Sequence, residues 1–263
     1  MRRVKEERTR PIGIFDSGVG GVSVVRAIRR ELPHETLLYF GDTANAPYGT
    51  KPVDEVLACV EQVMARFIKA DVKAVVIACN TATSVAAETL RKEYALPIIG
   101  MEPAVKPAHE LRHGGRVLVL ATPVTLSLPK FRRLMERYGE GVEPLPCPGL
   151  MELVERGCLE GEEIEHDLTR RLAPYDMTQV DAVVLGCTHY VFLRPTLRRM
   201  LPTHTAILDG NEGTARQLRH VLAARGALAS ETAEGSVTFD TSGDKAAVVP
   251  LMEKLATVPL DGV

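Results

Sequence analysis

The stretches that decide the fold are VKAVVIAC at Val72–Cys79 and VDAVVLGC at Val180–Cys187, which align with each other without a gap. After a charged second residue, Lys73 or Asp181, each continues as an uninterrupted apolar run that ends in a cysteine. Continuous runs of Val, Ile and Leu are typical of parallel strands that are covered on both faces. The repeat therefore predicts two similar α/β halves, with a boundary near Glu102–Pro103.

Similar apolar runs alternate with amphipathic stretches along most of the chain, which predicts helices on both faces of mostly parallel sheets, and so two three-layer halves. The C-terminal segment either completes the second half or returns to the first. Strands are expected at Ile12–Asp16, Thr36–Asp42, Ala74–Cys79, Pro97–Gly100, Arg116–Thr122, Ala182–Cys187, Ala206–Asp209 and Ser236–Asp240. Helices are expected over Val22–Glu31, Val53–Lys69, Ser84–Tyr94 and Ile164–Leu172.

The composition argues against several classes of protein. In 263 residues, 32 Lys and Arg stand against 34 Asp and Glu, and Trp is absent, so neither a basic surface nor a stacking platform for nucleic acid is expected. No apolar run approaches the roughly 18 residues of a membrane span. The N-terminal MRRVKEERTR has charges of both signs and predicts a frayed tail of a cytoplasmic protein rather than a signal peptide. Five cysteines, an odd number, do not suggest a secreted disulfide framework.

Two of these cysteines follow matching strands. Cys79 precedes Asn80 and Thr81, and Cys187 precedes Thr188 and His189, where a helix is expected to begin. Ligands of doubly wound folds bind at the carboxyl ends of strands, and a helix N-terminus there favours a thiolate. A buried cysteine that merely fills space is the alternative, but duplicated positions followed by polar residues favour chemistry. Packing is the expected role of the other three, Cys59, Cys147 and Cys158.

Two other interpretations of the cysteines are weaker. Cys187 and His189 could belong to a zinc site, but no paired CxxC or HxxxH spacing supports one, so no metal is expected. A redox disulfide between Cys79 and Cys187 lacks the CxxC signature.

Further polar residues stand after the first two strands. Asp16 and Ser17 open a glycine-rich turn that is neither a dinucleotide fingerprint nor a P-loop, and that could simply be a tight strand–helix connection. Pro47–Gly49 lies in a long loop, where function is often found, although alone it indicates only a turn. Glu155 lies on an amphipathic stretch, where a carboxylate is more often a solvated surface charge.

Together these segments resemble the glutamate racemase family, whose members need no cofactor and serve peptidoglycan synthesis and hence cell-wall biogenesis and cell shape. The motifs recur in the family's order over residues 11–215. They are GIFDSGVGG (Gly13–Gly21), YFGDT (Tyr39–Thr43), PYGTK (Pro47–Lys51), ACNTAT (Ala78–Thr83), EPAVKPA (Glu102–Ala108) and GCTHY (Gly186–Tyr190).

The resemblance implies an α/β fold of two domains, residues 1–102 with 213–263 and residues 103–212, with the active site in the cleft between them. It implies that Cys79 and Cys187 are catalytic bases, assisted by Asp16, His189 and Glu155. Glutamate is the expected partner, and a homodimer is compatible with the family. The residues implied to contact or orient the substrate are Asp16, Ser17, Tyr48, Gly49, Asn80, Thr81, Thr188 and His189.

Some residues depart from the family pattern, and other functions stay open. Val191 and Phe192 follow GCTHY in place of Pro and Leu, and Leu208–Ala215 differs from the usual Asp-Ser-rich segment. An aspartate or hydantoin racemase would use the same paired cysteines and differ in its side-chain pocket. A non-catalytic ligand-binding protein on the same fold would tolerate the loss of one cysteine, yet both are present.

Overall fold

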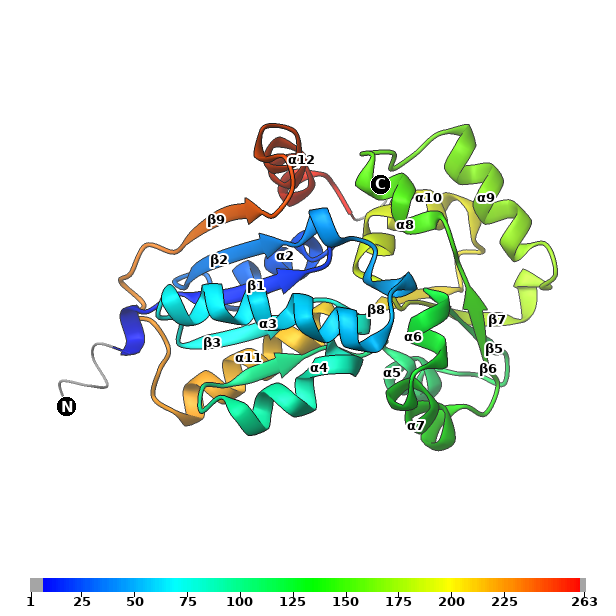
Figure 1. The fold of residues 1–263 in the computed structure, drawn as a ribbon. Coiled ribbons are helices and arrows are strands. Elements are labelled where there is room, and N and C mark those ends of the chain that lie inside the picture. Colours follow the sequence, from blue (N-terminus) through cyan, green and yellow to red (C-terminus); the bar gives the residue numbers. More distant parts are fainter. Residues whose placement is uncertain (1–6, 261–263) are drawn as a thin grey trace. The chain divides into compact units, whose positions relative to one another are not determined.

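Two parallel β-sheets, one in each of two units of the chain, form the framework of the computed structural model (Figure 1), which describes residues 7–260. Of the described residues, unit 1 comprises 7–101 together with Asn211–Ala256, and unit 2 comprises Glu102–Gly210 with 257–260. Every strand pairing in both sheets is parallel, so the predicted α/β class is confirmed. Most of the expected N-terminal tail, residues 1–6, lies outside the described residues.

The sheet of unit 1 has the strand order β4-β3-β1-β2-β9. Its last strand comes from the C-terminal part of the chain and pairs with β2 at the edge of the sheet. The strands are β1 (Ile12–Asp16), β2 (Thr36–Gly41), β3 (Ala74–Ile77), β4 (Ile98–Gly100) and β9 (Ser236–Thr241).

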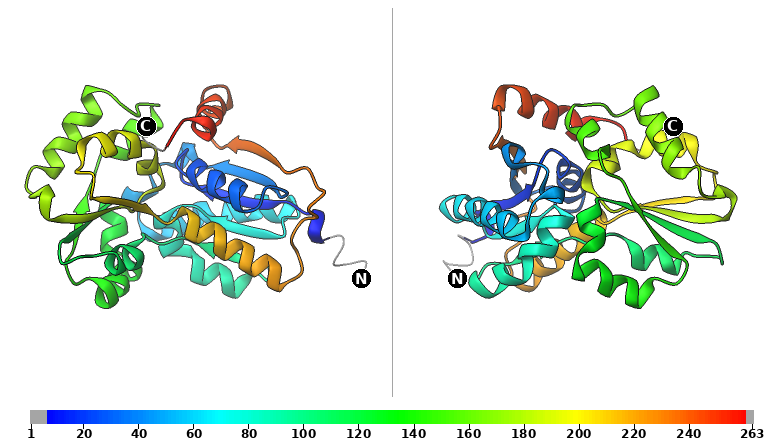
Figure 2. Two further views of the ribbon diagram at one scale, coloured as in Figure 1. Left: turned by 180° about the vertical axis from the view of Figure 1, so that it is seen from behind. Right: turned by 45° about the vertical axis from the view of Figure 1, so that its right-hand side comes forward.

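Helices cover both faces of this sheet, with α3 and α4 on one face and α2 and α11 on the other (Figures 1 and 2). On the α3 face, Phe15 packs against Phe67 with ring centroids 6.4 Å apart. Gly13 lets the helix approach, because a Cβ there would lie 2.8 Å from the Phe67 ring. The helices are α2 (Val22–Glu31), α3 (Val53–Lys69), α4 (Asn80–Glu93), α11 (Asn211–Ala224) and α12 (Lys245–Thr257), with short 3-10 helices η1 (Thr43–Asn45) and η2 (Tyr48–Thr50).

A fully buried ion pair joins the C-terminal part of unit 1 to its central strands. The Nζ atom of Lys73 lies 2.6 Å from Oε2 of Glu35, and the two side chains are 0% and 2% exposed. Lys73 also donates to the carbonyls of Arg8 and Ala227, and the N–H of Ala229 donates to Glu35. Burial lowers the pKa of Lys73, and the bonds to Glu35 oppose this effect. Both charges are therefore compensated, as buried charges must be.

The sheet of unit 2 has the strand order β6-β5-β7-β8. Helices α5 and α7 pack on one face, and α8 and α9 lie on the other side of the sheet (Figure 2). The strands are β5 (Arg116–Ala121), β6 (Val142–Pro146), β7 (Val180–Leu185) and β8 (Ala206–Asp209). The helices are α5 (Val105–Glu110), α6 (Pro123–Ser127), α7 (Pro129–Tyr138), α8 (Leu150–Glu155), α9 (Glu162–Leu172), η3 (Met177–Gln179), η4 (Thr188–Leu193) and α10 (Arg194–Met200).

The structure corrects the predicted strand ends. The strands expected to reach Cys79 and Cys187 end at Ile77 and Leu185, and each cysteine is instead the residue that caps the next helix. Helix α4 begins at Asn80 rather than at Ser84, because its polar first turn is buried and helical. Within residues 7–260, no helix is long and apolar enough to cross a membrane.

Candidate active site

In unit 1, Cys79 lies between the end of β3 and the start of α4. Its Sγ accepts a hydrogen bond from the backbone N–H of Ala82 at 3.4 Å, so a sulfur takes the place of the oxygen that usually caps a helix. The first-turn N–H groups and the positive end of the helix favour negative charge on this sulfur. Cys79 is 7% exposed, and Asn80 and Thr81 are buried beside it.

A short polar chain leads from this thiol to a carboxylate. The Sγ of Cys79 lies 3.8 Å from Oγ of Ser17, and Ser17 donates to Oδ1 of Asp16 at 3.1 Å. Asp16 is only 1% exposed, because it ends the central strand β1. The turn beyond it is tight, since a Cβ on Gly21 would lie 2.7 Å from the Cβ of Asp16. The glycine-rich segment therefore acts at least as a strand–helix connection.

The loop after β2 brings Tyr48 into the same buried cluster as Cys79. Its hydroxyl donates to Oδ2 of Asp42 at 2.5 Å, and Asn45 donates to both oxygens of that carboxylate. Burial, reinforced by the bond to Asp42, raises the pKa of Tyr48, so its hydroxyl stays a neutral donor. Gly49 is buried next to it. We call Asp16, Ser17, Tyr48, Gly49, Cys79, Asn80 and Thr81 the Cys79 cluster.

In unit 2, Cys187 occupies the corresponding position between β7 and η4. Its Sγ lies 3.6 Å from Nδ1 of His189, and Nε2 of that imidazole lies 2.6 Å from Oε1 of Glu155. Oγ1 of Thr188 lies 3.4 Å from the same Nδ1. Thus a thiol, an imidazole and a carboxylate follow one another within hydrogen-bonding distance. We call Glu155, Cys187, Thr188 and His189 the Cys187 cluster.

The imidazole of His189 is the strongly perturbed group of this cluster. Burial alone lowers the pKa of His189, but hydrogen bonds to Cys187 and Glu155 outweigh it and raise the pKa well above its ordinary value. The positive form of His189 is therefore favoured while its neighbours carry negative charge. Glu155 ends helix α8 half-buried, with 20% of its side chain exposed, and so is not a fully solvated surface charge.

In the described residues none of the five cysteines forms a disulfide. Cys147 is buried and donates to the carbonyl of Leu145, and burial raises its pKa to about 12. Burial also raises the pKa of Cys59, with a contribution from Asp42. A protonated thiol is a poor nucleophile and a poor base, which agrees with the packing role predicted for these two residues.

The structure brings each predicted residue into one of the two clusters, and it adds others that the sequence did not indicate. Asp42 fixes Tyr48, and Arg171, Tyr190 and Asp167 fix the segment before Glu155. Asp167 and Arg171 lie four residues apart on α9, a spacing at which side chains are neighbours, and they form an ion pair. Among residues 7–260, no group of three or more His, Cys, Asp or Glu side chains could hold a metal ion.

A thiol hydrogen-bonded to an imidazole that a carboxylate supports, at the carboxyl edge of a parallel sheet, is typical of an α/β enzyme. The family model described as Asp/Glu/Hydantoin racemase matches residues 12–218. The chain belongs to this family and is an amino-acid racemase, which is an isomerase. The predicted resemblance is thereby confirmed.

Individual relatives agree with this family. The chain is 51% identical over 256 residues to a glutamate racemase from Bifidobacterium adolescentis, an alignment that covers 94% of this chain and 98% of the relative. The structure of Escherichia coli glutamate racemase in complex with L-glutamate and the activator UDP-MurNAc-Ala superposes with a TM-score of 0.80 at 30% identity, covering 93% and 95% of the two chains. The Francisella tularensis glutamate racemase in complex with D-glutamate gives a TM-score of 0.81 at 26% identity, covering 97% and 96%.

Proposed function

We propose that this racemase interconverts L- and D-glutamate with two thiols as its acid and base, without a cofactor. Glutamate is supported by the relatives, whose names and bound ligands include both enantiomers. The observation that supports the two-base mechanism is the matched placement of Cys79 and Cys187, each two residues beyond the end of a parallel strand and each at the N-cap position of the next helix.

Inversion at the α-carbon requires that a proton leaves one face and that another arrives on the opposite face. One cysteine starts as a thiolate and takes the α-proton, which leaves an electron pair on a planar carbanion. The second cysteine starts as a thiol and donates its proton to the other face. For the opposite enantiomer the two cysteines exchange roles. His189, held between Cys187 and Glu155, assists the proton transfers of Cys187, and Ser17 with Asp16 assists those of Cys79.

The carbanion needs stabilisation, because the α-proton of a free amino acid is very weakly acidic. Preorganised donors directed at the α-carboxylate supply it where charge develops. The candidates are the hydroxyls and amides of the two clusters, Ser17, Asn80, Thr81 and Thr188. The bond between Tyr48 and Asp42 holds the backbone of Tyr48 and Gly49, which we assign to the side-chain carboxylate of glutamate.

Purified protein tests this function directly. After dialysis against a chelator and with no added cofactor, the circular dichroism of L-glutamate and of D-glutamate should decay to zero at equal final composition. Aspartate should be turned over hardly at all, because its shorter side chain leaves buried polar groups unpaired. Loss of activity on chelation with recovery on adding metal, or equal turnover of aspartate, would contradict the proposal.

A supply of D-glutamate for peptidoglycan, made in the cytoplasm, is the role that this activity would serve. Expression of the chain in a bacterium that requires external D-glutamate should remove the requirement. The Cys79→Ser variant, expressed to the same level, is the matched control and should not. Continued dependence on D-glutamate with the active wild-type chain would refute this role.

A further inference from the structure

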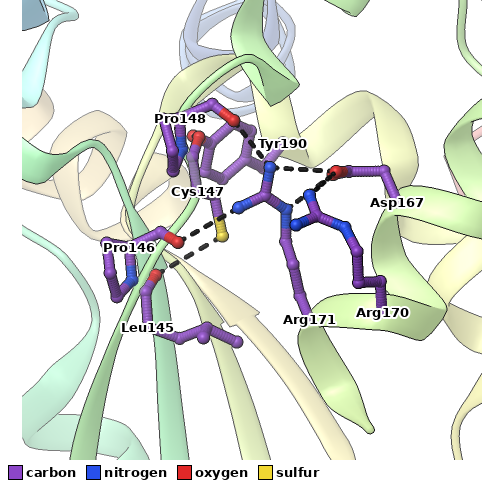
Figure 3. Close-up of polar contacts among 8 residues, drawn as sticks. All are labelled: Leu145, Pro146, Cys147, Pro148, Asp167, Arg170, Arg171 and Tyr190. Carbon is purple, nitrogen blue, oxygen red and sulfur yellow. Dashed lines mark hydrogen bonds and ion pairs between the residues drawn. The ribbon is translucent and has the colours of Figure 1, made fainter.

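The guanidinium group of Arg171 on helix α9 bonds to a carboxylate and to two carbonyl groups at once (Figure 3). Its Nε and Nη2 atoms donate to the two oxygens of Asp167 at 2.6 and 3.0 Å. Nη1 donates to the carbonyl of Pro146 at 3.2 Å, and Nη2 donates to that of Pro148 at 2.6 Å. The side chain is only 9% exposed. The guanidinium group is planar and its N–H donors point in fixed directions, so it can make these bonds together. The ammonium group of a lysine could not reproduce them.

The carbonyl groups belong to the segment Pro146–Gly149, which connects β6 to α8. The carbonyl between them, that of Cys147, accepts a hydrogen bond from the hydroxyl of Tyr190 at 2.9 Å. Three successive carbonyls are thus held by two side chains (Figure 3). Gly149 then adopts φ +82°, a conformation that favours glycine, and α8 begins at the next residue. The direction of α8 is set in this segment.

This segment is linked to both residues of the contact between Glu155 and His189. Glu155 is the last residue of the helix that leaves the segment, and Tyr190, which holds it, directly follows His189 in η4. Helix α8 packs against η4. A carboxylate at the C-terminal end of a helix also meets the negative end of the helix dipole, so its position depends on outside contacts.

We propose that Arg171 is a positioning residue, which together with Asp167 and Tyr190 holds the segment Pro146–Gly149 so that Glu155 stays in contact with His189. Arg171 acts on the chemistry of Cys187 without touching the substrate. The consequence for catalysis rests on the proposed function, whereas the effect on the thiol itself does not.

The first test measures the thiols without any substrate. Iodoacetamide alkylation of Cys187 and of Cys79 is followed by mass spectrometry as a function of pH in the whole protein. In Arg171→Met, loss of the Glu155 contact weakens the positive charge on His189 beside the Cys187 thiol, so Cys187 should be alkylated more slowly than in the wild type. The alkylation of Cys79 should keep its profile.

The matched control is Arg170→Met. Arg170 is the neighbouring arginine, donates to the same Asp167 at 2.8 Å, and is 65% exposed. The interactions found for Arg170 do not include the carbonyls of Pro146–Gly149. This control should therefore leave the alkylation profiles of both cysteines unchanged. A profile of Cys187 that is identical in Arg171→Met and the wild type would overturn the proposal.

The second test uses a half-reaction. Racemisation in either direction needs both thiols, one as base and one as acid, so its rate does not report on one thiol alone. The substrate is glutamate with chloride on its β-carbon. A thiolate takes the α-proton, the electron pair forms the Cα=Cβ bond, and chloride leaves. The resulting enamine tautomerises to an imine, and water releases ammonium to give 2-oxoglutarate, which is measured. The enantiomer that Cys79→Ser still converts is the one that Cys187 deprotonates.

Arg171→Met should convert that enantiomer about 10- to 100-fold more slowly and the other one within about two-fold of the wild type, since a displaced group close to the chemistry costs this much. Equal losses with both enantiomers would show a merely structural role and contradict the proposal. If Arg171→Met fails to fold, Tyr190→Phe removes only the bond to Cys147 and should give the same one-sided loss. Wild-type protein that does not racemise glutamate refutes the proposed function, while the alkylation profiles still decide the role of Arg171.

Discussion

Cys79 and Cys187 occupy equivalent backbone positions, but their surroundings differ in kind. The contacts of Cys79 include a backbone N–H from the first turn of α4 and the hydroxyl of Ser17, which follows β1. Cys187 precedes a 3-10 helix without capping it through its side chain, and its partner is an imidazole that a carboxylate holds. The repeated fold thus places the two thiols alike, but a titrating imidazole lies next to Cys187, whereas the carboxylate of Asp16 reaches Cys79 only through Ser17.

The largest effect should come from removing either thiol. Cys79→Ser and Cys187→Ser should each lower racemisation in both directions by roughly 10³-fold or more, because a serine hydroxyl is far too weak an acid to act as an anionic base near neutral pH. Each variant should still eliminate chloride from one enantiomer of the β-chloro substrate, and the two should prefer opposite enantiomers. From the family resemblance we expect that Cys79 deprotonates D-glutamate and that Cys187 deprotonates L-glutamate. Substantial racemisation by either variant would contradict the role of both thiols as acid and base, and His189 would be the first alternative base to examine.

The next effect concerns Glu155. Glu155→Gln should slow elimination from the enantiomer that Cys187 deprotonates by about 10- to 100-fold and spare the other one. The charge of Glu155 helps to raise the pKa of His189, so its removal lets the imidazolium lose its proton at lower pH. The basic limb of the pH profile for that enantiomer should therefore move to lower pH.

Glu152→Gln is the matched control for this prediction, because it lies on the same helix and is exposed. Its rates and pH profiles should equal those of the wild type. If Glu155→Gln slows elimination from both enantiomers equally, the carboxylate does not act through Cys187 alone.

Ser17→Ala should have a smaller effect, on the reaction that depends on Cys79. Removing the hydroxyl that lies 3.8 Å from Cys79 should slow elimination from the enantiomer handled by Cys79 by about 10-fold, a typical loss for one neutral hydrogen bond to a charged group. The pH profile should keep its shape, because no titrating group is removed. A shifted pH profile would show that Cys79 also depends on a titrating neighbour, namely Asp16.

The smallest effect should come from Cys147. Its pKa of about 12 keeps this buried thiol protonated at pH 8, so iodoacetamide should modify Cys79 and Cys187 long before Cys147. Cys147→Ser should change racemisation by less than about two-fold, since a hydroxyl can also donate to the carbonyl of Leu145. Rapid alkylation of Cys147 in the folded protein would contradict the burial of this thiol.

Much of the framework follows from the sequence, because buried parallel strands require uninterrupted apolar runs. The predicted ranges Ile12–Asp16, Ala206–Asp209, Val22–Glu31 and Val53–Lys69 coincide with β1, β8, α2 and α3. Strand β6 was missed because Pro144 and Pro146 interrupt its pattern. Proline is tolerated there because β6 is an edge strand and need not donate on both sides.

The site was predictable where a residue is adjacent in sequence to a strand end, and less so where the contact is long-range. Cys79 and Asp16 follow or end such strands, which singled them out, whereas His189 received a role only from the family resemblance. Glu155 reaches His189 across 34 positions of the chain, and only the family resemblance singled it out. Arg171 also contacts the backbone carbonyls of Pro146 and Pro148. Every residue has a backbone carbonyl, so no pattern in the sequence indicates these contacts.

Strand β9 has a consequence for the biosynthesis of the chain. Synthesis runs from the N-terminus, so β1 to β4 emerge first, while β9 and the carbonyl of Ala227 emerge only after all four strands of unit 2. Until then the outer edge of β2 has no neighbour, and Lys73 and Glu35 lack the backbone groups of Ala227 and Ala229. An unpaired strand edge invites association with other chains. The nascent polypeptide therefore carries an open edge on β2 until β9, the last strand of the two sheets to be translated, covers it.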